Sequence, residues 1–252
     1  MNIKRLIPNL FTMLNLFCGC LALVFVSNWN YSMAFYFVCL GIFFDFFDGF
    51  FARKFNVAGP LGVQLDSLAD MITSGLVPGY AMFSVLHRIE FSEFQKTQHL
   101  FEAPIFYLPF LAFAITLGAC YRLAKFNIDT RQSDSFIGLP TPANSLFVTG
   151  LIVFLSKDFP FTTIDSFLAN KWVLIGISFL CAFVMNAEIP LFSLKIKDFS
   201  FAKYKLQVFF LLVSGVMLVL LQIVAVPLII VLYVLLSVIN NVINKPSSHG
   251  KL

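Results

Sequence analysis

The chain has 252 residues, of which 59% are hydrophobic and 12% charged, so its composition is far more apolar than that of a soluble domain. Its net charge of +4 does not indicate nucleic-acid binding, because the basic residues lie in short clusters between apolar runs, where membrane orientation signals belong. The 33 phenylalanines are spread through these runs without alternating with polar residues, which favours a bundle of membrane helices over a membrane barrel.

The first predicted membrane helix covers residues 9–26. Two basic residues precede this apolar run, as in a signal peptide, but no small-residue cleavage pattern follows it. Asn9, Thr12 and Asn15 also place polar groups at helical spacing along the run. We therefore expect it to be the first spanning helix of the fold.

Further apolar segments follow, and each approaches the length that a helix needs to cross a bilayer. Only a short stretch before Pro227 separates the last two, so we expect a helical hairpin at 206–243, followed by a polar tail at 244–252. The predicted fold is an all-α integral membrane protein, with residues 1–252 forming one membrane domain of about eight helices. After the first helix, the predicted spans are 31–52, 61–87, 105–126, 140–156, 171–190, 206–222 and 225–243.

The distribution of basic residues predicts the orientation of these helices. With the amino terminus in the cytoplasm, all but four of the 17 Lys and Arg residues fall in inner segments, the exceptions being Arg88, Lys96, Lys157 and Lys171. We therefore expect both termini on the cytoplasmic side of the cell membrane, with membrane lipids around the helices.

Four aspartates lie at the predicted cytoplasmic ends of the second and third helices, among Phe, Leu, Ile and Val. An ionised carboxylate in such a setting costs several kcal/mol unless it is paired, bound to metal or protonated. Asp45 and Asp48 are three residues apart, and Asp66 and Asp70 are four apart, so each pair projects from one face of its helix. Antiparallel packing would join the pairs in an all-oxygen cluster, which favours Mg²⁺ or Mn²⁺ over Zn²⁺. The sequence therefore predicts a metal site facing the cytoplasm.

Small residues and one arginine surround these aspartates. Gly49 and Ala52 leave room for a ligand beside the backbone, and Arg53 is placed to meet a phosphate. Gly62 opens the third helix near its amino terminus, where anions are favoured. These features suit a pyrophosphate. The alternative is that the aspartates form structural ion pairs with the nearby basic residues, namely Arg53, Lys54, Arg122 and Lys125.

The order of these residues resembles the signature of the CDP-alcohol phosphotransferases. The match runs through Asp45, Asp48, Gly49, Ala52, Arg53, Gly62, Asp66 and Asp70. The resemblance implies a six-helix catalytic core over residues 1–190 and is consistent with a homodimer. It also implies that Asp45, Asp48 and Asp66 hold divalent metal, as two ions, with help from Asp70. Asp70 is then also the catalytic base on the acceptor hydroxyl.

Three further blocks resemble the bacterial phosphatidylserine synthases within that superfamily: Pro8 to Gly19, Arg122 to Asn127 and Gly138 to Asn144. This resemblance implies CDP-diacylglycerol as donor and L-serine as acceptor, with phosphatidylserine and CMP as products. Asn9 and Thr12 are expected to bind the nucleotide of the CDP-lipid, together with Gly49, Ala52, Arg53 and Gly62. The expected acceptor residues are Arg122, Lys125, Pro140 and Thr141.

Two other functions are open at this stage. In the first, the same reaction uses glycerol 3-phosphate or inositol phosphate as acceptor, although such phosphorylated acceptors should recruit more basic residues than this sequence offers. In the second, the protein is a divalent-cation transporter whose aspartates form an ion pathway. The clustering of the acids at one membrane face, away from the midplane, argues against transport.

Overall fold

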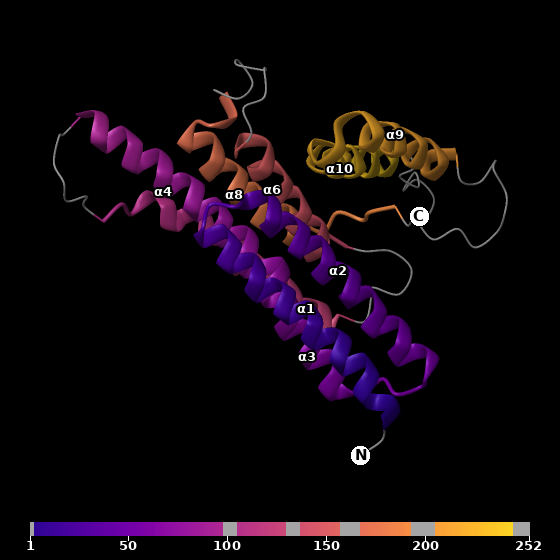
Figure 1. Cartoon of the computed structure of the whole chain (residues 1–252). Helices are drawn as coiled ribbons and strands as arrows, with labels where there is room; N and C mark the ends of the chain where they lie inside the picture. Colours follow the sequence, from indigo (N-terminus) through magenta and orange to yellow (C-terminus); the bar gives the residue numbers. More distant parts are fainter. Residues whose placement is uncertain (1–2, 98–104, 130–136, 157–166, 193–204, 244–252) are drawn as a thin grey trace, which may run out of the picture.

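A computed structural model describes residues 3–97, 105–129, 137–156, 167–192 and 205–243, and the expected polar tail at 244–252 lies outside them. The described residues form an all-helical bundle, in which one isolated bridge between Ile137 and Pro190 is the strand-like contact (Figure 1). The all-α prediction is therefore confirmed.

The helices follow the apolar runs of the sequence closely. The third predicted span is one long rod, because α3 continues through a π-helical segment, η1, into α4 without a break. The amino-terminal half comprises α1 (Ile3–Ser27), α2 (Tyr31–Lys54), α3 (Pro60–Asp70), η1 (Met71–Leu76) and α4 (Val77–Thr97). The remainder comprises the 3₁₀ helix η2 (Leu108–Phe113), α5 (Ala114–Ile128), α6 (Thr141–Ser156), α8 (Lys171–Asn186), α9 (Lys205–Leu221), the 3₁₀ turn η3 (Gln222–Val224) and α10 (Ala225–Ile243).

The turn between α2 and α3 is defined by its capping residues. The backbone N–H of Val57 donates to the Ala52 carbonyl at 3.0 Å and that of Asn56 donates to the Arg53 carbonyl at 3.1 Å, which is a Schellman cap. Asn56 takes the left-handed conformation that this cap needs, with φ 51°. Pro60 then starts α3, at a position where no N–H is required. This short turn sets the ends of α2 and α3 side by side.

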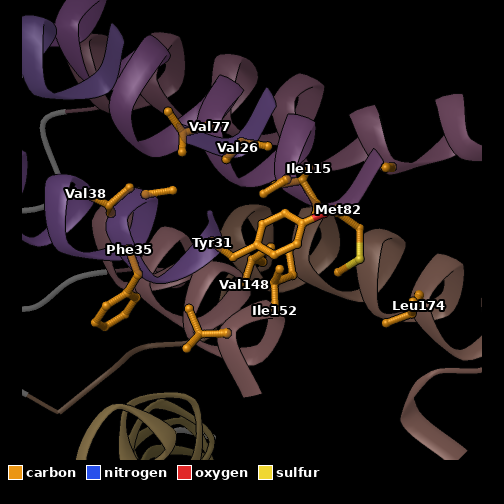
Figure 2. Packing of buried hydrophobic residues seen from close by; sticks show 14 of the residues in the cluster. Val26, Tyr31, Phe35, Val38, Val77, Met82, Ile115, Val148, Ile152 and Leu174 are labelled. Atoms are coloured by element: carbon orange, nitrogen blue, oxygen red, sulfur yellow. The ribbon is translucent and has the colours of Figure 1, made fainter. Parts of the chain in front are cut away.

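The apolar core fills one half of the bundle. Its buried side chains come from the second half of α1, the first half of α2, and facing parts of α4, α5, α6 and α8. Figure 2 shows Tyr31 among aliphatic neighbours that include Met82 and Ile152. The other half contains buried polar side chains, among them Thr12, Asn15, Asp48, Asp70, Thr73 and Ser74. The core therefore anchors the helices at one end and leaves the other end for polar groups.

Among the described residues, four helical segments are long and apolar enough to cross a membrane: Leu6–Ser27, Tyr31–Lys54, Leu108–Ile128 and Lys205–Ile243. Helices α6 and α8 are apolar but shorter, with 16 residues each. These helices fit a membrane protein. The count of eight spans and the cytoplasmic position of the termini stay predictions.

Helices α9 and α10 fold back on each other at Gln222, which has a φ of 52°. Phe210 of α9 lies 5.6 Å from Tyr233 of α10 between ring centroids, and Phe192 contacts both rings. The pair packs against α6, where a Cβ added at Gly150 would lie 3.0 Å from Pro227 Cδ. Figure 1 shows the pair beside the bundle.

Candidate active site

Three aspartates from neighbouring helices meet at the end of the bundle opposite the apolar core. Asp45 and Asp48 project from α2, and Asp66 projects from α3 after the Schellman turn. One carboxylate oxygen from each lies within 4.8 Å of the others. The helical spacing and the short turn therefore produce the cluster that the sequence predicts.

The chemistry of this cluster fits a divalent cation. Three carboxylates supply only oxygen donors, and hard cations such as Mg²⁺ and Mn²⁺ prefer such ligands. Within the described part of the chain, no Lys or Arg nitrogen lies within 4.0 Å of Asp45, Asp48, Asp66 or Asp70. These negative charges are thus gathered without a basic partner from the protein, which is the situation that metal binding relieves.

The structural ion-pair alternative is wrong for the described residues. Lys125 pairs with Glu188 at 3.9 Å, and the ammonium of Lys54 lies over the ring of Phe50. The guanidinium of Arg122 donates through Nε to the Leu139 carbonyl at 3.2 Å. Each of these basic side chains is therefore engaged away from the aspartates.

Helix α1 contacts three of the aspartates through polar side chains. The Thr12 hydroxyl donates to Asp48 Oδ2 at 2.6 Å. One turn further along, Asn15 Nδ2 donates to Asp70 Oδ1 at 3.1 Å and lies 3.4 Å from Asp45 Oδ1. Sequence reasoning placed Thr12 at the site but left out Asn15. The polar spacing of Asn9, Thr12 and Asn15 along an apolar helix was the signal that pointed to it.

A cavity of about 440 Å³ opens beside the cluster, between α1, the end of α2 and the start of α3. Asp48 and Asp66 lie in its wall, whereas Asp45 and Asp70 are not among the residues that line it. All six residues predicted to bind the CDP-lipid line it as well: Asn9, Thr12, Gly49, Ala52, Arg53 and Gly62. The structure thus brings the nucleotide-binding candidates together on one surface, next to two of the metal-ligand candidates.

Two of the three glycines in this wall, Gly49 and Gly62, leave space where it is needed. A Cβ added at Gly49 would lie 3.8 Å from Arg53 Nη2, so the arginine side chain lies back along its own helix over Gly49. A Cβ at Gly62 would lie 4.0 Å from Asn9 Oδ1. Side chains larger than glycine at either position would project into the cavity and reduce its volume.

The four acceptor candidates gather elsewhere, where α5 meets the start of α6. Arg122 is buried and bonds to Leu139, Pro140 caps α6 through its carbonyl, and Thr141 is the buried first residue of that helix. Lys125 is half-exposed beside Glu188. None of the four is among the residues that line the cavity. They form a group of their own, outside the wall of the cavity.

This group is held by a short strap at 137–140 that precedes α6. The Gly138 N–H donates to the Ile189 carbonyl at 2.9 Å, and the Leu139 N–H donates to the Val184 carbonyl at 3.1 Å. Gly138 has a φ of 76°, and a Cβ there would collide with the Met185 carbonyl oxygen. Glycine is therefore required in the strap, which ties the end of α8 to the start of α6.

Asp70 is the last residue of α3, on the rod that packs against α5, the helix of Arg122. It is buried, and the widened π turn of η1 begins at the next residue. Along the same rod, Ser67 accepts a hydrogen bond from Asn127, and a Cβ at Gly75 would contact Ala119. Asp70 and Arg122 are therefore at a similar level on adjacent, antiparallel helices.

Comparisons with known proteins agree with this geometry. Residues 5–184 match the family model described as CDP-alcohol phosphatidyltransferase. Among similar curated proteins, one from Bacillus subtilis is 36% identical over 140 residues, covering 54% of this chain and 69% of the relative. One from Helicobacter pylori is 35% identical, and the match covers 62% of this chain and 60% of the relative. One from Methanocaldococcus jannaschii is 30% identical over 191 residues, covering 76% and 77%. All three carry the name CDP-diacylglycerol–serine O-phosphatidyltransferase.

Proposed function

Because the chain belongs to the CDP-alcohol phosphatidyltransferase family, we propose that it transfers the phosphatidyl group of CDP-diacylglycerol to L-serine, which gives phosphatidylserine and CMP. The observation that carries this proposal is the placement of Asp48 and Asp66 in the wall of the cavity that the nucleotide-binding candidates line. A site for a pyrophosphate and a cluster suited to metal thus share one surface.

The cavity suits the CDP part of the donor. Asn9 and Thr12 offer hydrogen-bonding groups on α1, and Arg53 offers a cation for a phosphate oxygen. The amino terminus of α3 faces the same space and favours negative charge. The outer faces of the helices are apolar and would border the bilayer, where the acyl chains of the donor remain.

The residues of the cluster would hold a divalent cation, Mg²⁺ or Mn²⁺, through Asp45, Asp48 and Asp66, with Asp70 beside them; we propose two ions. When bound, such cations offset the charge of the pyrophosphate and make CMP a better leaving group.

The carboxylate of Asp70 is the base for the transfer. Asp70 accepts the proton of the serine hydroxyl as the serine oxygen bonds to the phosphorus that carries the diacylglycerol. The bond from that phosphorus to the CMP oxygen breaks, and CMP leaves with the electron pair. Arg53 holds the pyrophosphate in line for this displacement. Burial of Asp70 keeps bulk water away from the reacting oxygen.

Serine is the acceptor that best fits the neighbouring group. Arg122 and Lys125 supply positive charge for the serine carboxylate, and Thr141 supplies a hydroxyl at the start of α6. Little basic charge is left over for the extra phosphate of glycerol 3-phosphate or inositol phosphate. The names of the similar proteins favour serine as well.

We also propose that the protein lies in the cell membrane with both termini and the active site on the cytoplasmic side. Eight helices would span the bilayer, the core at 1–190 would carry catalysis, and two copies would pair through membrane helices. The basic inner segments support this orientation. Serine and CMP are water-soluble, so a site open to the cytoplasm gives both direct access.

An acceptor assay tests the reaction. Purified protein in mixed micelles with CDP-diacylglycerol is given labelled serine, glycerol 3-phosphate or inositol phosphate in parallel, with Mg²⁺, Mn²⁺ or a chelator. The expected result is a labelled lipid from serine alone, together with CMP, and only with metal present. Product from another acceptor would reassign the substrate. No CMP release under any metal, with metal flux into proteoliposomes, would support the transporter instead.

A further inference from the structure

We propose that Asn15 is a positioning residue for the transfer reaction: it fixes the Asp70 carboxylate so that one oxygen stays free to accept the acceptor proton. This inference rests on the proposed function. It concerns a residue of α1 that the family signature on α2 and α3 does not include, and that belongs to neither the cavity wall nor the group of three metal-ligand candidates.

Asn15 reaches the two aspartates that do not line the cavity. Its side-chain Nδ2 is 3.1 Å from Asp70 Oδ1 and 3.4 Å from Asp45 Oδ1, and the residue is fully buried. A neutral amide can donate two hydrogen bonds from one nitrogen, so it bridges two like-charged groups without adding charge. The shorter contact goes to Asp70, which is therefore the carboxylate that Asn15 orients most strongly.

The backbone of Asn15 is held in turn by the π segment. The Thr73 hydroxyl donates to the Asn15 carbonyl at 3.0 Å, and Thr73 is fully buried. Glycines allow this close approach, because a Cβ at Gly19 would lie 2.5 Å from Thr73 Oγ1 and one at Gly41 would lie 2.8 Å from Thr73 Cγ2. The π turn that begins after Asp70 thus ties the helix of the base to the helix of Asn15.

The orientation of the Asn15 amide is also fixed. Its Oδ1 has no hydrogen-bond partner among the described residues, and a Cβ added at Gly41 would lie 3.0 Å from it. The amide therefore presents its N–H groups to the carboxylates and leaves its oxygen unpaired, an arrangement that costs free energy. Oδ1 of Asp70 accepts from this donor, and in the proposal the acceptor proton goes to Oδ2.

The test distinguishes a role of Asn15 in positioning the Asp70 carboxylate from a role in binding substrate or metal. In Asn15→Leu, of similar volume but without a donor, we expect kcat for phosphatidylserine formation to fall by about a hundredfold, because general-base catalysis depends on placement. The KM for CDP-diacylglycerol and the dissociation constant of Mn²⁺, measured by electron paramagnetic resonance, should stay within about threefold of wild type. A kcat within that same range of wild type overturns the proposal, and so does a loss of Mn²⁺ binding that matches the loss of activity.

Two isosteric variants complete the experiment. Thr73→Val removes the bond to the Asn15 carbonyl and should lower kcat by about tenfold, with little further loss when it is added to Asn15→Leu. An unchanged kcat in Thr73→Val overturns the proposal even if Asn15→Leu fails to fold. Thr149→Val is the matched control, because the Thr149 hydroxyl is buried and bonds only within its own helix, to Ser145. If the wild-type protein binds Mn²⁺ but makes no phosphatidylserine, the proposed function is contradicted. Failure of the Asn15 proposal differs from this outcome, because the wild-type protein is then active and the variants keep its kcat.

Discussion

Thr12 donates its hydroxyl hydrogen to Asp48 Oδ2 at 2.6 Å, across the interface of α1 and α2, and both residues are buried. The first helix of the protein therefore takes part in the site. Asn15 repeats the arrangement one turn along, with Asp70 as its main partner. The aspartates on α2 and α3 are thus held in place from a third helix.

Replacing Thr12 with Val should weaken metal binding. The substitution leaves a buried carboxylate oxygen without its donor, and removal of such supporting bonds costs about 10- to 100-fold in metal affinity. Mn²⁺ titration followed by electron paramagnetic resonance measures the effect, and Thr149→Val, which removes a buried hydroxyl elsewhere, should bind as wild type. Equal Mn²⁺ affinity in Thr12→Val and wild type would show that the bond does not support the cluster.

Asp48→Asn and Asp66→Asn should each abolish turnover. Each change removes a negative ligand from the group of three carboxylates, so metal should no longer be held at the pyrophosphate. The measurement is labelled phosphatidylserine formed at rising Mg²⁺ or Mn²⁺, beside direct Mn²⁺ titration. Wild-type rates in either variant would remove that residue from the site.

Asp70→Asn should also abolish turnover, but for a different reason. The amide cannot accept the proton of the serine hydroxyl, whereas the group of three carboxylates remains intact. We therefore expect Mn²⁺ titration to remain measurable while product formation falls by at least about a hundredfold. Loss of all Mn²⁺ binding would instead identify Asp70 mainly as a ligand.

Arg122→Ala should raise the KM for serine more than it raises the KM for CDP-diacylglycerol. The guanidinium lies beside the strap that leads into α6 and outside the cavity lining, so its loss should disturb the acceptor side first. Initial rates over a grid of both substrate concentrations measure the two constants. A rise confined to CDP-diacylglycerol would move Arg122 to the nucleotide side.

Gly49→Leu should weaken donor binding, whereas Gly49→Ala should be tolerated. A Cβ at this position meets only Arg53 Nη2 at 3.8 Å, which is an ordinary contact, but a leucine would extend into the cavity. The expected result is a KM for CDP-diacylglycerol raised by about tenfold or more in the leucine variant, with the serine KM little changed. If leucine and alanine variants behave alike, the donor does not occupy this space.

Much of this architecture could be predicted from the sequence, because apolar runs of helical length leave few alternatives in a membrane. The rod at 60–97 begins one residue before its predicted start at 61 but continues ten residues beyond its predicted end at 87. Its extension carries Glu90 and Glu93, which pair with Lys171 of α8 at 2.7 and 2.8 Å. Hydropathy cannot predict such an extension, since it depends on a partner that is distant in the sequence.

The site could be predicted where the spacing of residues along a helix alone determines which side chains share a face. Aspartates that are three or four positions apart lie on one helix face, and the cluster of Asp45, Asp48 and Asp66 follows from the short turn. The π turn after Asp70 was not predictable, because the run Met71–Leu76 has no periodicity that distinguishes it from an α-helix. The polar spacing along the first helix indicates Asn15, but its contacts depend on that turn and on two glycines, so its role can be assigned only from the structure.

The 16-residue length of α8, which begins after Asn170 and ends before Ala187, has a consequence for the surrounding lipid. At 1.5 Å per residue this helix rises about 24 Å, which is less than the ~30 Å of hydrocarbon in a typical bilayer. In the membrane orientation proposed above, the bilayer would thin beside α8 and bring headgroups and water closer to it. Because the strap joins the end of α8 to the start of α6, an amino acid from the aqueous phase would then have a shorter apolar path on the side where Arg122 lies.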